Sequence, residues 1–410
     1  MPRSARAGLI ATALVFHASG PAVAEQVVLD LDAAVARAVA RAPAAITARG
    51  QLAEAEATRT GAAILLADNP VLLVDSGPRF GGGGPTTTDV HVRLEQIVPL
   101  VSPRGPRRAV AEATIAHATL TADAALLDVR LEATTAFYEA LHADRAVELA
   151  VHAAEVARHA AEVAERKRRA GDLTELDASM VLAAAGRARA TVKATEAERA
   201  ATLGKLARLI GLGVGDTVVL RGELRPPAPL ALDDLVAAAA ARPDVRALAA
   251  EQTVAARELA LARTAGAPAL GVFAQYGREE DQTIVLGGVG LTLPIWSRGQ
   301  GERAEARAKA ARAAAAHEAT RHAATREVAD AFAAYVLARD AVDLFENEVL
   351  PPLDRGEQLL ARSLETGVVT VPDYLVARQQ SLELRREHLD RQLALATAYA
   401  RARLLAGVTR

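Results

Sequence analysis

The sequence contains no cysteine, and this absence excludes several classes of chemistry. Without thiols the chain cannot form disulfides, thiolate zinc sites, a cysteine nucleophile or the lipid-modified N-terminal cysteine of bacterial lipoproteins. Aromatic residues are also scarce, at 3% of 410 residues, whereas 51% of the residues are apolar. Alanine and leucine must therefore fill most of the core.

The chain also lacks an excess of either charge. Its 48 basic and 50 acidic residues leave a net charge of −2, whereas nucleic-acid binders usually carry a basic excess that displaces counterions from phosphates. We therefore expect no nucleic-acid partner. The H-E-x-x-H, G-x-S-x-G and P-loop motifs are absent as well, so we expect no enzyme and no cofactor. His142, His152 and His159 are expected to be solvated surface residues, and no metal site is predicted.

Residues 1–24 have the features of a secretory signal peptide. Arg3 and Arg6 precede an apolar centre at residues 9–16, and a small-residue cleavage site follows at residues 22–24. A short membrane anchor is the alternative, but the apolar centre is too brief to span a bilayer. No later stretch approaches the roughly 18 apolar residues of a spanning helix. Any further membrane contact must then come from strands or from an interfacial surface.

The rest of the chain contains an internal repeat, whose corresponding positions are marked by proline and glycine. Four landmarks recur in the same order about 196 residues apart: Asn69-Pro70 with Ala267-Pro268, Pro99 with Pro294, Arg104-Gly105 with Arg298-Gly299, and Gly171–Thr174 with Gly367–Thr370. We predict a first repeat at residues 25–215, a linker at residues 216–230 and a second repeat at residues 231–410.

Each repeat is predicted to contain a helix, two strands and two long helices joined by a tight turn. The helices are expected at 30–66, 103–168 and 173–211, and again at 231–263, 300–365 and 371–407. A helix from 103 to 168 would be about 100 Å long at about 1.5 Å per residue, and it needs a neighbour along its length. Apolar residues four and three apart, such as those from Leu149 to Val163, indicate coiled-coil packing of several helices. A plain two-stranded hairpin is the alternative, and Pro351-Pro352 should bend the fifth helix.

The strand segments alternate between apolar and polar residues. Residues 89–100 and 283–295 alternate most clearly, which is typical of a transmembrane β-barrel but also of a small sheet packed on helices. Four strands cannot close a barrel, so the membrane interpretation requires oligomers, and a trimer would supply twelve strands. Phe80, Phe273, Tyr276 and Trp296 lie around the strands, either as interfacial aromatics or as core residues.

This duplicated order, after a signal peptide, resembles the TolC family of outer-membrane efflux channels. The resemblance covers the whole mature chain and includes Val349-Leu350-Pro351 on the fifth helix. It implies a mainly α fold with a small β part, made of long coiled-coil hairpins and four transmembrane strands per chain. Three chains would form a twelve-stranded barrel in the outer membrane and a helical tunnel across the periplasm.

The resemblance also implies partners and site residues. A passive export duct of this family works with a periplasmic adaptor protein, an inner-membrane pump and outer-membrane lipid. The family's entrance aspartate falls on Asp373, while the next position, often acidic, is Val376 here. The chain length and the missing lipid cysteine favour the heavy-metal-efflux branch, which is CzcC-type.

The two turns are the expected adaptor docking tips, because Leu173, Val368 and Val369 place apolar side chains there. The residues assigned to docking are Gly171, Leu173, Thr174, Gly367, Val369 and Thr370. The alternative is that the turns only cap the hairpins. Two other functions remain open: a periplasmic coiled-coil adaptor, and a periplasmic structural protein without a pore.

Overall fold

A computed structural model describes residues 26–66, 68–80, 86–213, 215–226, 228–279, 282–366 and 368–408. The predicted signal peptide, 1–24, lies outside these residues. The first repeat contains β1 (Gln26–Leu29), α1 (Leu31–Arg41), α2 (Pro43–Ala62), β2 (Val71–Arg79), β3 (Thr87–Pro99), α3 (Arg104–Ala170) and α4 (Glu175–Ile210). The remaining elements are β4 (Thr217–Leu220), α5 (Leu232–Ala239), α6 (Pro243–Ala262), β5 (Ala269–Glu279), β6 (Gln282–Thr292), α7 (Gln300–Leu344), η1 (Phe345–Val349), α8 (Leu350–Glu365) and α9 (Val371–Leu405).

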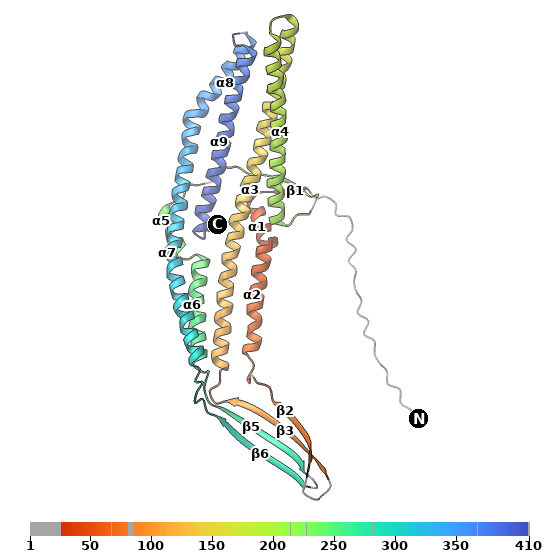
Figure 1. The fold of residues 1–410 in the computed structure, drawn as a ribbon. Coiled ribbons are helices and arrows are strands. Elements are labelled where there is room, and N and C mark those ends of the chain that lie inside the picture. Colours follow the sequence, from red (N-terminus) through yellow and green to blue (C-terminus); the bar gives the residue numbers. More distant parts are fainter. Residues whose placement is uncertain are drawn as a thin grey trace, which may run out of the picture.

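The molecule is a long helical body with a sheet at one end and two hairpin tips at the other (Figure 1). α3 has 67 residues and spans about 100 Å at about 1.5 Å per residue. It packs against α2 and α4 on one flank and against α6 and α9 on the other. α7 then packs against α6 and α9. The mainly α fold with a small β part, predicted from the sequence, is confirmed.

Two of the predicted helices are broken. The stretch 30–66 is divided into α1 and α2 at Ala42, and 231–263 is divided into α5 and α6 before Pro243. Pro43 begins α2 and Pro243 begins α6. In the first turn of a helix the backbone N–H has no partner within the helix, so the N–H that proline lacks costs nothing there. The residue before each proline adopts an extended ψ, which ends the first helix. The prediction of one unbroken helix in each place was wrong.

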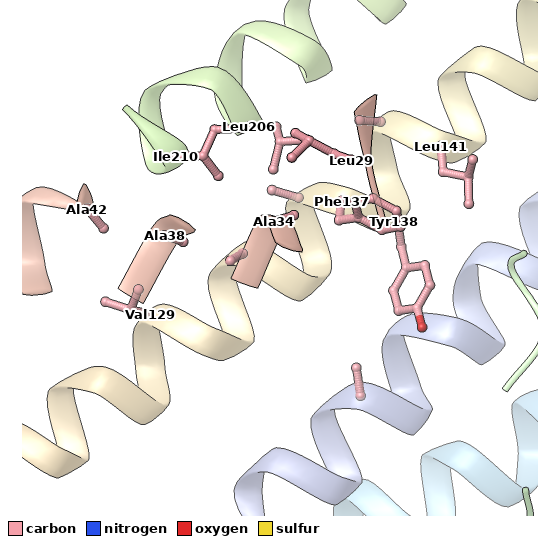
Figure 2. Packing of buried hydrophobic residues seen from close by; sticks show 14 of the residues in the cluster. Leu29, Ala34, Ala38, Ala42, Val129, Phe137, Tyr138, Leu141, Leu206 and Ile210 are labelled. Atoms are coloured by element: carbon pink, nitrogen blue, oxygen red, sulfur yellow. The ribbon is translucent and has the colours of Figure 1, made fainter. Parts of the chain in front are cut away.

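The helical core is built largely from alanine, as the composition requires. In the main cluster α1 inserts Ala34 and Ala38 between Val129 of α3 and Ile210 of α4 (Figure 2). Phe137 of α3 is 1% exposed and is the largest fully buried side chain there. Because alanine side chains are short, the helix backbones approach closely and the helices pack side by side along the body.

The helix predicted at 300–365 changes geometry just before Pro351-Pro352. Residues Phe345–Val349 form a π-helical turn, η1, between α7 and α8. Such turns release a backbone hydrogen bond and are a known cause of helix bends. The predicted disturbance at these prolines therefore takes the form of a π-helical insertion on their N-terminal side.

Two sheets are present among the described residues. The smaller is the parallel pair of β1 and β4, which places a strand inside the range predicted as a linker, 216–230. The larger is antiparallel, in the order β2-β3-β5-β6, so its central pair joins the two repeats. Among the described helices, none combines the length and the apolar character needed to cross a membrane.

Candidate functional site

One face of the large sheet is apolar and exposed. The register places Leu72 opposite Leu94, and Val272 opposite Val289. In another row of the same face, Val92 faces Tyr276, and Tyr276 faces Val285. Exposed side chains on this face are Leu72, Val74, Val90, Leu94, Val272, Tyr276, Val285, Val289 and Leu291. No described segment covers this face, so it is available to lipid or to another protein.

The opposite face carries charged side chains that pair with one another. Arg79 on β2 bonds to Asp89 on β3 at 2.8 Å and also to Glu279 on β5. Arg93 lies 3.9 Å over the ring of Phe273, as a cation–π contact. Phe273 therefore belongs to the polar face of the sheet and is not an interfacial aromatic residue on the apolar face. The alternation predicted over residues 89–100 has separated a charged face from an aliphatic one.

The sheet is open at both edges. β2 and β6 each pair on one side only within the described residues. Their other backbone donors and acceptors need water or another chain, since an unpaired group in lipid costs several kcal/mol.

The first hairpin tip lies between α3 and α4. Gly171 ends α3 in a left-handed conformation with φ of 85°, which favours glycine. The Thr174 hydroxyl accepts the backbone N–H of Asp177 at 3.1 Å and donates to the Asp177 carboxylate at 2.7 Å. Arg168 and Arg169 hold the pKa of Glu165 at about 2 by hydrogen bonds. The turn is thus a capped and charged end of the hairpin.

The second tip, between α8 and α9, repeats this capping arrangement. The Thr370 hydroxyl accepts the Asp373 N–H at 3.3 Å and donates to the Asp373 carboxylate at 2.7 Å. Asp373 is exposed, whereas Asp177 is half-buried. Gly367 lies outside the described residues.

The tips also present apolar side chains, but not all of those that the sequence singles out. Leu173 and Val369 are half-buried against a cluster that includes Val181 and Val371. Val368 is the exposed member of the predicted set, at 78%. Sequence reasoning missed three further exposed residues near the tips, which are Leu176, Met180 and Val376. Their exposure depends on how α4 and α9 pack against the neighbouring helices, so the sequence offers no signal that separates them from the buried tip residues.

Two exposed stripes that consist mostly of alanine run along the flanks of the helical body. On α4 the stripe contains residues spaced four and three apart, all exposed: Leu176, Met180, Ala183, Arg187, Ala190, Ala194, Ala197 and Ala201. On α7 the exposed stripe contains Ala304, Ala308, Ala311, Ala315, Ala319 and Ala323. α4 and α7 lie on opposite flanks, separated by α3 and by α6 and α9. The spacing on α4 is that of a coiled-coil seam, and the stripe on α7 shares it from Ala304 to Ala315. Both stripes lack a partner within the described chain.

The histidines do not gather into a metal site. His142 is 9% exposed, and its Nε2 lies 2.7 Å from the Asp390 carboxylate of α9. The expectation that His142 is solvated was therefore wrong, because α9 packs over this part of α3. His152 and His159 are exposed, as expected. Among the described residues, no group of three histidine, aspartate or glutamate side chains could hold a metal ion.

Residues 235–408 match the family model of the outer membrane efflux protein. The predicted resemblance to this family is confirmed. No curated protein sequence matches the chain. The matched range begins within α5 and extends past the end of α9.

Solved structures extend the likeness to both repeats. The CmeC outer membrane channel of Campylobacter jejuni has a TM-score of 0.75 at 15% identity, over 92% of this chain and 85% of that one. A membrane protein from Pseudomonas aeruginosa has a TM-score of 0.74 at 19% identity, over 92% of each chain. The MtrE outer membrane channel of Neisseria gonorrhoeae has a TM-score of 0.70 at 19% identity, over 93% and 89%. At these identities the likeness establishes the fold.

Proposed function

We propose that this protein is the outer-membrane channel of a tripartite efflux pump and acts as a passive export duct from the periplasm to the exterior. The observation that carries the proposal is the large sheet, with its exposed aliphatic face, its ion-paired opposite face and its two open edges. A sheet of this kind suits a barrel wall with lipid outside and water inside. The match to the outer membrane efflux family supports the same assignment.

The proposed assembly is a homotrimer. Three four-stranded sheets would supply twelve strands, and each open β2 edge would pair with the β6 edge of the next copy. The exposed stripes on α4 and α7 support the same arrangement along the helical body, because they lie on opposite flanks of the chain. A contact between two different surfaces generates a closed ring when the rotation fits. The polar sheet face and the helices would then surround one continuous channel.

The proposed orientation places the sheet in the outer membrane and the helical body in the periplasm. The hairpin tips then face the inner membrane, where an adaptor protein and an inner-membrane pump would supply cargo and energy. Val368 and Leu176 present exposed apolar surface for the adaptor, beside the capped turns at Thr174 and Thr370. Asp373 is the proposed entrance residue, since threefold symmetry brings three copies around one axis.

Planar-bilayer conductance of the purified mature protein tests this function. We expect extraction from outer membranes only with detergent, followed by stable ion-conducting insertion. A fully soluble mature chain that never conducts would instead support a periplasmic adaptor or structural role. Those alternatives fit the sheet less well, because they leave its aliphatic face without a partner.

A further inference from the structure

The helices meet the large sheet at one level of the molecule. α2 ends at Ala62 and α6 ends at Ala262, while α3 begins at Arg104 and α7 begins at Gln300. Figure 1 shows these four helix ends at the same height, just inside the base of the strands. In the proposed orientation this junction faces the periplasmic leaflet of the outer membrane.

The junction is free of acidic residues over most of its length. The four stretches that form it, 57–67, 96–111, 259–268 and 293–301, contain no aspartate or glutamate. In a chain with 50 acidic residues, these four stretches are locally depleted of negative charge. Six arginines lie there: Arg59, Arg104, Arg107, Arg108, Arg263 and Arg298. We refer to these six residues as the arginine belt.

None of the belt arginines forms a salt bridge within the described residues, although many arginines elsewhere in the chain do. Arg104 Nε donates to the Ala63 carbonyl at 3.1 Å, and Arg107 Nη2 donates to the Ile64 carbonyl at 2.9 Å. Arg298 Nε donates to the Ile295 carbonyl at 3.2 Å. Across the described residues, the guanidinium groups of Arg59, Arg108 and Arg263 have no hydrogen-bond acceptor, and all three arginines are exposed. These three guanidinium groups thus have no ion-pair partner within the described residues, although Glu112 lines the same pocket as Arg59 and Arg108.

A band of exposed apolar side chains adjoins the arginine belt on the side of the sheet. It consists of Ile64, Leu65, Leu100, Val101, Leu293, Ile295 and Trp296. Trp296 is 88% exposed. Aliphatic side chains beside tryptophan and arginine are the composition of a membrane–water interface, where the aliphatic part enters the acyl region and the charge meets the headgroups.

We infer that the arginine belt binds the phosphate groups of anionic phospholipids and so fixes the depth of the channel in the membrane. This inference rests on the proposed function. A guanidinium group matches a phosphodiester because it can donate two parallel hydrogen bonds to the phosphate oxygens. Threefold symmetry would repeat the belt around the base of the barrel, next to a ring of lipid headgroups. An anionic lipid is favoured over a zwitterionic one because the six belt arginines form no ion pair within the described residues and so outnumber the nearby carboxylate of Glu112.

Lipid retention by the detergent-purified trimer tests this inference. The trimer is mixed with phosphatidylglycerol or with phosphatidylcholine, and the bound lipids are counted by native mass spectrometry. We expect the unaltered protein to retain phosphatidylglycerol about tenfold better than phosphatidylcholine. The triple variant Arg59→Gln, Arg108→Gln, Arg263→Gln should lose this preference while remaining trimeric, because those side chains make no contact that holds the fold.

A matched control removes the same charge elsewhere. Arg355, Arg362 and Arg386 lie on α8 and α9, are exposed and form no salt bridge within the described residues. The variant Arg355→Gln, Arg362→Gln, Arg386→Gln should keep the lipid preference. Equal loss of the preference in both triple variants would overturn the inference, as would equal retention of the two lipids by the unaltered protein. Conductance in pure phosphatidylcholine bilayers separates the channel proposal from the lipid-binding inference. A protein that conducts there but shows no lipid preference would refute the lipid-binding inference and leave the channel proposal intact.

Discussion

Asp373 and Asp177 make the same pair of contacts to a capping threonine, so capping alone cannot explain any functional difference between them. What differs is their exposure: Asp373 is exposed and Asp177 is half-buried. Three exposed carboxylates around a narrow mouth would repel one another and attract cations.

We therefore predict that Asp373→Ala weakens divalent-cation block of single-channel conductance, while Asp177→Ala changes it little. Each substitution should also cost about 0.3–1 kcal/mol of helix-dipole stabilisation, because both positions lie in a first helical turn. Block is measured in planar bilayers with the same divalent cation for both variants. Equal changes in the two variants, or no change in either, would make Asp373 an ordinary helix-start residue.

Arg242 is a buried charge whose partners come from two helices. It is 8% exposed, and it bonds to Asp244 at 2.8 Å and to Glu327 of α7 at 3.0 Å. It also follows the break between α5 and α6, so these bonds hold that break against α7. A charged hydrogen bond at a buried position contributes about 1.5–3 kcal/mol.

We predict that Arg242→Met lowers the free energy of unfolding by about 1.5–3 kcal/mol, because a methionine fills part of the volume without the bonds. The control is Arg326→Met, since Arg326 pairs with Asp330 on the exposed surface of α7 and such pairs contribute about 0.5 kcal/mol. Thermal unfolding of the trimer in detergent compares the two variants. An equal loss in both would mean that burial adds nothing at Arg242.

The structural role of a single residue can be predicted from the sequence when its partners are sequence neighbours. It cannot be predicted when its partner lies far away in the sequence. Gly171 and Thr174 are predictable because a left-handed C-cap and a threonine N-cap depend on neighbouring residues. The burial of His142 is not, because its partner Asp390 is 248 residues away in the sequence. Pro43 carries a helix-break signal, but the apolar period continues on both sides and conceals it.

At the scale of elements, the hairpin tips combine a buried and an exposed apolar set. Leu173 and Val369 pack into the hairpin core, whereas Val368 and Leu176 face away from it. The sequence predicts apolar tips correctly as residue types, but it cannot separate the two sets, since that depends on how α9 packs against α3 and α4.

We predict that Val368→Asp with Leu176→Asp abolishes export by the assembled pump while trimer mass and thermal stability stay unchanged. The exposed side chains hold nothing within the chain, so a charge there should disturb only a partner's apolar surface. Efflux is measured in cells, and adaptor binding with the purified components. Leu173→Asp with Val369→Asp is the contrasting variant, and it should lower stability. Normal export by the first variant would assign the tips to hairpin capping only.

At the scale of the whole molecule, the features that need a neighbour all point to one assembly. The open edges of β2 and β6, the stripe on α4 and the stripe on α7 each lack a partner within the described chain. The strand pairs and the duplicated order can be predicted from the sequence, and with them the need for more than one copy. The stripes cannot, because an alanine-rich helix shows small residues on every face, and only the fold reveals which face stays uncovered.

We predict that Ala190→Glu with Ala194→Glu on the α4 stripe shifts the detergent-purified protein from trimer to monomer. The two glutamates would bury negative charge in a helix–helix contact that offers only Arg187 as a nearby cation, and burying charge in this way costs several kcal/mol. Ala200→Glu is the matched control, because Ala200 is exposed on the charged side of α4 that also carries Lys193 and Glu196. Light scattering coupled to size exclusion measures the mass of each variant. Trimeric mass in both variants would remove α4 from the subunit interface, and monomeric mass in the unaltered protein that still conducts would refute the shared barrel itself.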